Sequence, residues 1–160
     1  LIGLMPTLVR VWSRARRPVT KAWEQSHPSS LAWGVGPGRS SSDAAFDLNL
    51  AKEQAHLAGW DSAEAALDLW KAYEMVTADA QLQEARALGF PMRLAWMLLS
   101  TYRRPRVLAA HGTLSRAVVA WQGNIAGCGH ANSLLLVLTM RALRRAHARG
   151  PPGTCINERL

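Results

Sequence analysis

The sequence predicts an α/β fold of the helix-rich α+β kind, in which a small antiparallel sheet is flanked by helices. Three observations lead to this prediction. Apolar residues recur at helical spacing in five separate segments. Capping residues and glycine or proline stops bound these segments. Residues 106–121 contain β-branched residues around a His111-Gly112 pair, which is typical of a hairpin.

The N-terminal part of the chain is predicted as two helices joined by a loop. The first helix spans residues 7–25, and Pro18 within it is expected to end or kink it. The segment that follows is rich in glycine, proline and serine, which is typical of a loop. Ser40 or Ser42 is then expected to cap a second helix, and Gly59 to stop it.

The second half of the chain is predicted to contain helices, a hairpin and a loop. In order, these are helices over residues 77–88 and 91–102, the hairpin over 106–121, a glycine-rich loop over 122–130 and a helix over 131–148. In the helix over residues 91–102, Leu94, Met97, Leu98 and Thr101 are expected to point inward. Four tryptophans are expected in the core rather than in base stacking: Trp12, Trp33, Trp96 and Trp121.

The composition limits the possible partners and compartments. The net charge is +8, and residues from position 103 onward hold nine arginines against one acid, Glu158. This charge favours a polyanion, and we assign nucleic-acid binding to Arg103, Arg104 and Arg106; the alternative is charge that only keeps the chain in solution. Two cysteines without CxxC spacing form no disulfide framework, which predicts an intracellular location, cytoplasm or nucleus. No apolar run approaches the ~20 residues of a membrane span, so no membrane partner is expected.

Five motifs in order resemble the reverse transcriptase family of the non-LTR retroelement and group II intron type. They are LMPTLVRVWSR (residues 4–14), WGVGPGRSSSDAA (33–45), ALDLWKAYE (66–74), GFP (89–91) and GNIAGC (123–128). The resemblance covers nearly the whole chain and implies a partial polymerase fingers and palm. Residues 1–60 would be fingers-like and residues 61–160 palm-like. An RNA template, a DNA primer and a dNTP are the partners that it implies.

The motif over residues 66–74 resembles the first palm motif. Residues 62–69, which overlap its start, are predicted as a strand only because of this resemblance, since their Ala and Leu content favours a helix. The resemblance implies that Asp68 is a catalytic metal ligand and that the backbone carbonyl of Leu69 also faces a metal. Mg²⁺ or Mn²⁺ would be the ion, because nucleotidyl transfer uses two divalent metals with oxygen ligands. The alternative for Asp68 is an aspartate in a turn or a helix cap.

Nucleotide-binding roles are implied for four further residues: Tyr73, Arg39, Gly123 and Gly127. Tyr73 would pack under the incoming sugar and exclude a 2′-hydroxyl, the alternative being a core aromatic. Arg39 would lie on the nucleotide and template side, the alternative being a solvated loop arginine. The two glycines would let the backbone approach the nucleotide closely. Ala126 stands where the family usually has glutamine, and Gly129 where proline is common, which puts efficient nucleotide handling in doubt.

The second set of metal-binding carboxylates is missing from these residues. No aspartate follows Asp79, and the only later acids are Glu84 and Glu158. With Leu1 at the start and no Asp-Asp turn, the chain is expected to be an internal fragment that stops short of that turn. One carboxylate cannot supply octahedral coordination to two Mg²⁺ ions, so no polymerase activity is expected from this chain alone. The alternatives are a non-catalytic basic nucleic-acid-binding or scaffolding protein, and a retroelement relic.

Overall fold

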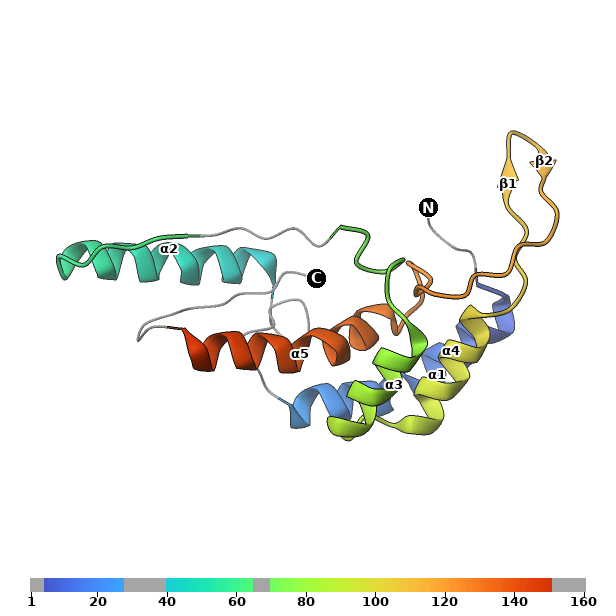
Figure 1. Ribbon diagram of the computed structural model, residues 1–160, viewed down its shortest axis with the longest axis horizontal. Coiled ribbons are helices and arrows are strands. Elements are labelled where there is room, and N and C mark those ends of the chain that lie inside the picture. Colours follow the sequence, from blue (N-terminus) through green and yellow to red (C-terminus); the bar gives the residue numbers. More distant parts are fainter. Residues whose placement is uncertain (1–4, 28–39, 65–69, 151–160) are drawn as a thin grey trace.

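The computed structural model describes residues 5–27, 40–64 and 70–150. Within these ranges the chain forms five α-helices and one two-stranded antiparallel sheet, which confirms a helix-rich α+β fold (Figure 1). The helices are α1 (Thr7–Ser26), α2 (Ser41–Leu57), α3 (Ala78–Ala87), α4 (Met92–Tyr102) and α5 (Ala131–Arg149). The strands are β1 (Ala109–Ala110) and β2 (Thr113–Leu114).

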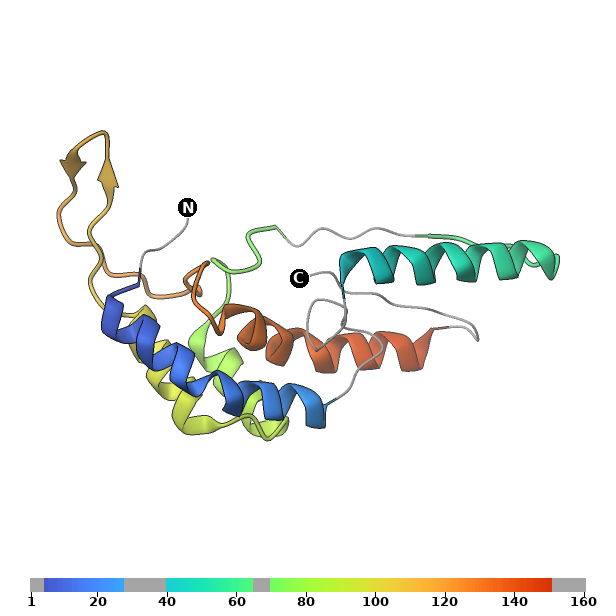
Figure 2. The ribbon, with the colours of Figure 1, turned by 180° about the vertical axis from the view of Figure 1, so that it is seen from behind.

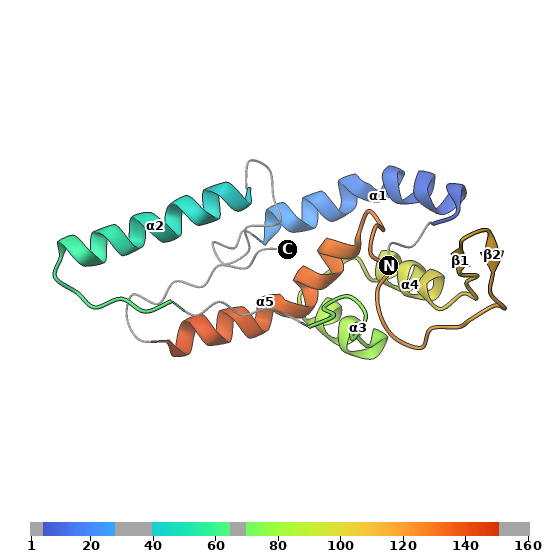
Figure 3. The ribbon, with the colours of Figure 1, turned by 90° about the horizontal axis from the view of Figure 1, so that it is seen from above.

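The core lies among α1, α3, α4 and α5. Helix α3 packs against both α4 and α5, and α1 lies across α4 in the view of Figure 2. Figures 1 and 3 show α2 extending past the C-terminal end of α5, at the opposite end of the molecule from the hairpin. The largest fully buried side chains include Tyr102, Phe90, Leu98 and Leu134. An ion pair of 3.1 Å between Arg141 and Glu84 also joins α5 to α3.

The predicted helix ends are confirmed where capping residues mark them. Ser40 caps α2 and forms a capping box with Asp43, in which each side chain accepts a hydrogen bond from the other's backbone N–H. Thr77 accepts a hydrogen bond from the backbone of Ala80 at the start of α3. Gly59 and Gly89 follow α2 and α3 with φ of +70° and +62°, the left-handed conformation that glycine adopts without strain.

Helix α1 continues through Pro18 to Ser26, so the prediction that this proline could end the helix is wrong. Proline removes one backbone hydrogen bond and crowds the preceding turn. Side chains on both sides of Pro18 hold the helix in place. The carbonyl of Ser13 and the hydroxyl of Thr20 both bond to His130, and the Trp23 indole donates to the Leu88 carbonyl at 3.0 Å.

The hairpin is confirmed in position, but its strands are shorter than predicted. The two strands are two residues long each, with a further bridge between Arg106 and Val118. His111 and Gly112 both have positive φ, +48° and +77°, as a two-residue type I′ turn requires. Every residue from 107 to 119 is exposed, so no packed face extends the pairing.

Three core predictions are wrong. Trp121, which follows the hairpin, is 83% exposed. Trp96 and Met97 are about half exposed, because α4 buries the neighbouring face of the helix. That face consists of Leu94, Ala95, Leu98, Leu99 and Tyr102. Trp12 is partly buried as predicted, and Trp33 lies outside the described residues.

The strand predicted over residues 62–69 is absent from residues 62–64, which form no regular element, and its remainder lies outside the described residues. The helices that the structure describes include none that is long and apolar enough to cross a bilayer.

Candidate functional site

Two segments that are far apart in sequence are held together at the start of the glycine-rich loop. The Gly123 amide donates to the Val76 carbonyl, and the Asn124 amide donates to the Tyr73 carbonyl, both at 2.7 Å. The segment of residues 71–76 forms a turn in which the Lys71 carbonyl accepts from the amides of Glu74 and Met75. The structure thus brings two predicted site residues, Tyr73 and Gly123, to one place.

Both the backbone conformation at position 123 and its surroundings require a glycine there. Its φ is +91°, which disfavours any residue with a side chain. A Cβ atom here would lie 2.8 Å from the Glu74 carbonyl oxygen and 3.0 Å from the Glu74 Cα. Those neighbours are backbone atoms, so they cannot rotate away. Gly127 also has positive φ, +93°, later in the same loop.

The Tyr73 ring is held at both ends. Its side chain is partly buried against the hydrophobic core, while its hydroxyl donates to the Asn132 Oδ1 at 2.7 Å. Asn132 is the second residue of α5, so the tyrosine connects the turn to the start of that helix. The ring therefore has a fixed orientation beside the loop.

The end of the loop is anchored to α1 by His130, which is fully buried. Its Nε2 lies 3.0 Å from the Ser13 carbonyl oxygen, and its Nδ1 lies 3.3 Å from the Thr20 hydroxyl. Burial lowers the pKa of His130 below its ordinary value, and the Arg17 charge lowers it further. The neutral ring, with its proton on Nε2, suits this environment, because a carbonyl can only accept a hydrogen bond.

Arg17 provides a second link between α1 and the loop. Its Nη1 donates to the Gly129 carbonyl at 2.5 Å. Sequence reasoning did not single out Arg17, His130 or Asn132. No local pattern marks these residues, because each bonds to a partner that is far away in the sequence.

The other predicted site residues either lie outside the described ranges or follow α4. Asp68, Leu69 and Arg39 lie outside the described residues. Arg103 and Arg104 are exposed after α4. Arg106 is partly buried; its Nη2 donates to the Tyr102 carbonyl and its backbone pairs with Val118.

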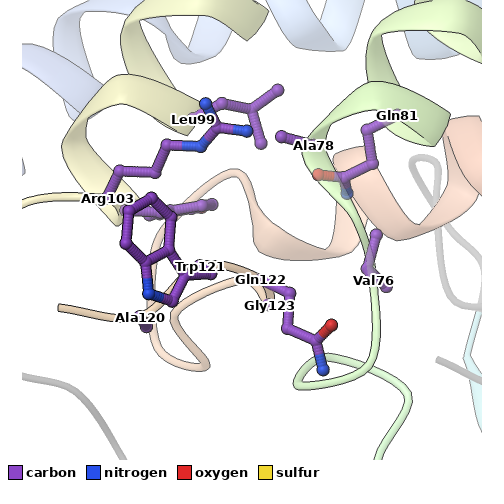
Figure 4. Close-up of a pocket in the computed structure, with 10 residues that line it drawn as sticks. Val76, Ala78, Gln81, Leu99, Arg103, Ala120, Trp121, Gln122 and Gly123 are labelled. Carbon is purple, nitrogen blue, oxygen red and sulfur yellow. The ribbon is translucent and has the colours of Figure 1, made fainter.

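A shallow cleft lies between α3, α4 and residues 120–123 (Figure 4). Gln81 lines one side of it, and Arg103 with Trp121 lines the other. The Gln81 side chain is 1% exposed, and neither its oxygen nor its nitrogen has a hydrogen-bond partner among the described residues. A water molecule would satisfy such an amide. Tyr102 also lines the cleft, and burial raises the pKa of its phenol well above the ordinary value.

Over the described ranges, no three His, Cys, Asp or Glu side chains come close enough to hold a metal ion. Glu74 is the acid in the turn of residues 71–76, and its side chain is exposed. The described residues of this turn and of the loop over residues 122–130 therefore supply one exposed carboxylate, Glu74, and no second carboxylate beside it.

Comparison with known proteins identifies no relative of this chain. No protein-family model matches the chain, and neither a curated protein nor a solved structure matches it significantly.

Proposed function

We propose that the chain is a reverse transcriptase-like nucleotidyltransferase fragment, with parts of the fingers and the palm, that does not polymerise DNA alone. The observation that carries this proposal is the pairing of residues 73–76 with Gly123 and Asn124. In the family that the sequence resembles, these two segments belong to the first and second palm motifs. Their contact is what a nucleotide site between those motifs needs.

Tyr73 has the properties of a steric wall for an incoming sugar. A wall discriminates between deoxyribose and ribose only if it does not move, because small displacements at a site remove its selectivity. The Tyr73 hydroxyl donates a hydrogen bond to Asn132, and the Tyr73 backbone carbonyl accepts one from the Asn124 amide. Both bonds restrain the residue that would make this contact.

Gly123, in the loop that pairs with the Tyr73 turn, also supports the proposal. A glycine that tolerates no Cβ lets the two backbones approach each other closely. An exposed Gly127 later in the loop gives a second place where a nucleotide or template strand can approach the backbone. Ala126 lacks the side-chain amide of the glutamine that the family usually has there, so weak nucleotide binding is expected.

The chemistry explains why the fragment would be inactive. Two-metal nucleotidyl transfer needs carboxylates that bind both ions, and the metals stabilise the attacking and leaving oxygens. Asp68 with the Leu69 carbonyl would supply part of one metal site. Since no aspartate follows Asp79, this chain has no other carboxylate of the kind that the family uses. RNA template, DNA primer and dNTP are the proposed partners, with Arg39, Arg103, Arg104 and Arg106 as phosphate contacts.

A paramagnetic ion can test the proposed site without requiring catalysis. Mn²⁺ and a dNTP are added to the ¹⁵N-labelled chain, and amide signals are followed by NMR. We expect broadening of the amides of residues 70–76 and 123–127. The amides of residues 109–114 serve as an internal reference, because the hairpin extends away from the loop (Figures 1 and 2).

The matched variants are Asp68→Asn and Asp79→Asn, which remove the same charge. Asp79 lies in the first turn of α3 and has no proposed role in metal binding. Broadening that disappears in Asp68→Asn and persists in Asp79→Asn supports the site. Broadening that is absent, or equal in both variants, contradicts the proposal.

Primer extension tests the inactivity. With an RNA template, a DNA primer, dNTPs and Mg²⁺ or Mn²⁺, no product is expected from the 160-residue chain. Template-dependent product that Asp68→Ala abolishes would show a complete active site and overturn this part of the proposal.

A non-catalytic basic nucleic-acid-binding or scaffolding protein is the second candidate. It is favoured by the exposed cations of α1, which have no acidic partner in the described ion pairs. A retroelement relic would retain the same cations. Oligonucleotide binding without Mn²⁺-dependent broadening near Tyr73 would support this candidate over the first.

A further inference from the structure

Helix α1 carries four cations along one side: Arg10, Arg14, Arg17 and Lys21, which we call the basic ladder. Their spacing of four, three and four residues places them above one another on a helix of 3.6 residues per turn. The ladder extends over ~16 Å of helix axis at 1.5 Å per residue. Arg17 is half-buried and the other three are exposed. The ladder therefore presents a line of positive charge to the solvent.

None of the four ladder residues forms an ion pair with another described residue. The single acid of α1, Glu24, accepts a hydrogen bond from the Ser133 hydroxyl at 2.6 Å. Both ion pairs of the described residues, Lys52–Glu64 and Arg141–Glu84, lie elsewhere. Like charges at these spacings repel, and Arg10 lies near the helix N-terminus, where positive charge is unfavourable. The ladder thus opposes the formation of the helix that carries it.

Contacts on the other side of α1 hold the helix in place and leave the ladder open. Trp23 bonds to Leu88, while Ser13 and Thr20 bond to His130. Arg17 is the point where the ladder meets the loop of the candidate site, through its bond to the Gly129 carbonyl. The line of charge therefore passes the loop at Arg17 and extends along α1 on both sides of that residue.

We propose that the basic ladder binds the phosphates of a nucleic acid. Arginine suits this role because its planar guanidinium can donate two hydrogen bonds to one phosphate. Neutralised phosphates release condensed counterions, and that release drives binding. Arg17 would direct the bound strand toward residues 123–129. The ladder belongs to α1, whereas Arg103, Arg104 and Arg106 follow α4, and the inference does not rest on the proposed polymerase ancestry.

An anionic membrane surface is the competing partner, because basic amphipathic helices also bind lipids. Such helices insert aromatic and large apolar side chains into the bilayer. The aromatic residues of α1 point the other way, since Trp23 is 5% exposed and Trp12 packs against the core. The exposed apolar stripe consists of Leu8, Val11 and Val19 without an aromatic ring. The ladder therefore fits a nucleic acid strand better.

The test compares two double variants of equal charge. Arg10→Gln/Arg14→Gln removes half of the ladder, and Arg86→Gln/Arg93→Gln removes two exposed arginines from α3 and α4. Fluorescence anisotropy measures binding of a labelled single-stranded oligoribonucleotide, and of the corresponding oligodeoxynucleotide, over a range of salt concentrations. We expect the ladder variant to bind about twenty-fold more weakly at 0.1 M salt and to lower the salt slope by about 1.4. The control variant should change affinity by less than about three-fold.

Thermal unfolding separates this role from a structural one. Removing repulsion along α1 should leave the melting temperature of Arg10→Gln/Arg14→Gln unchanged or slightly higher, although binding is lost. Arg10→Lys/Arg14→Lys keeps the charge and should retain most of the affinity.

Equal loss of binding in the two glutamine variants would overturn the inference, because it would show a diffuse charge effect. Binding to phosphatidylserine vesicles without binding to either oligonucleotide would also overturn it. The Mn²⁺ experiment depends on Asp68 rather than on α1, so failure of the ladder and failure of the proposed function can be told apart.

Discussion

The hairpin of residues 106–118 and the loop of residues 123–130 are close in sequence but are stabilised in opposite ways. The hairpin contains Val107, Leu108, Leu114 and Val118, and all of them are exposed. The loop is rich in glycine and polar residues, yet it buries Asn124, Ile125, Cys128 and His130. Apolar content therefore does not decide which of the two segments is inside.

Partners from distant parts of the chain account for the difference. The loop accepts a hydrogen bond from Arg17, and two of its backbone amides donate to the carbonyls of Tyr73 and Val76. A buried segment must have its backbone polar groups paired, and here α1 and residues 73–76 supply the partners. The hairpin pairs mainly with itself, through a few backbone bonds around the His111-Gly112 turn. The comparison predicts that equivalent substitutions will have large effects in the loop and small effects in the hairpin.

Gly123→Ala should give the largest effect. The substitution forces alanine to a φ of +91° and places its Cβ against the Glu74 backbone. We expect the free energy of unfolding to fall by about 3 kcal/mol, measured by urea denaturation. Gly112→Ala is the matched control in the hairpin, since Gly112 has a φ of +77° with no neighbour within 4 Å of its would-be Cβ. It should cost about 1 kcal/mol, and equal losses would show that conformation alone matters.

His130 should make stability depend on pH. Because the pKa of His130 is lowered in the folded state, the unfolded chain binds its proton more readily, and stability falls as pH drops below about 6.5. The loss cannot exceed about 1.4 kcal/mol per pH unit for one proton. Denaturation at pH 7.5, 6.5 and 5.5 should show this loss in the wild type and a smaller one in His130→Gln. The same pH profile in the wild type and in His130→Gln would contradict the assignment.

Tyr73→Phe should have a moderate effect. It removes the hydroxyl that donates to Asn132 at 2.7 Å while retaining the ring. We expect a loss of about 1 kcal/mol, because Asn132 is exposed and can bond to water instead. A double-mutant cycle with Asn132→Ala measures the coupling between the two side chains. Additive losses would show that the bond does not restrain the ring.

Leu114→Thr in the hairpin should have the smallest effect. Leu114 is 70% exposed, and threonine is well suited to a strand, so stability should change by less than about 0.5 kcal/mol. Leu98→Ala provides the contrast in the core, where the side chain is fully buried and a loss of about 3 kcal/mol is expected. A large loss in Leu114→Thr would show that the hairpin is packed in solution.

The sequence allowed the helices and the hairpin turn to be predicted, together with part of the candidate site. Tyr73 and Gly123 were predicted from a resemblance, and the structure brings them together. Arg17, His130 and Asn132 were not predicted, because each acts through a partner that is far away in sequence. Asp68 stays a prediction.

What the sequence determined by itself is where helices begin and end at capping residues and glycine stops. The Ser40–Asp43 capping box, Gly59 and Gly89 act through backbone groups within a few residues of themselves, so their effect is visible in a local pattern. Only the tertiary structure decided which surfaces are buried. In that structure Trp96 and Trp121 are exposed, and α1 continues past Pro18. These outcomes depend on contacts between segments that are separated along the chain, and the free energy of such contacts is set by packing and hydrogen-bond partners rather than by local propensity.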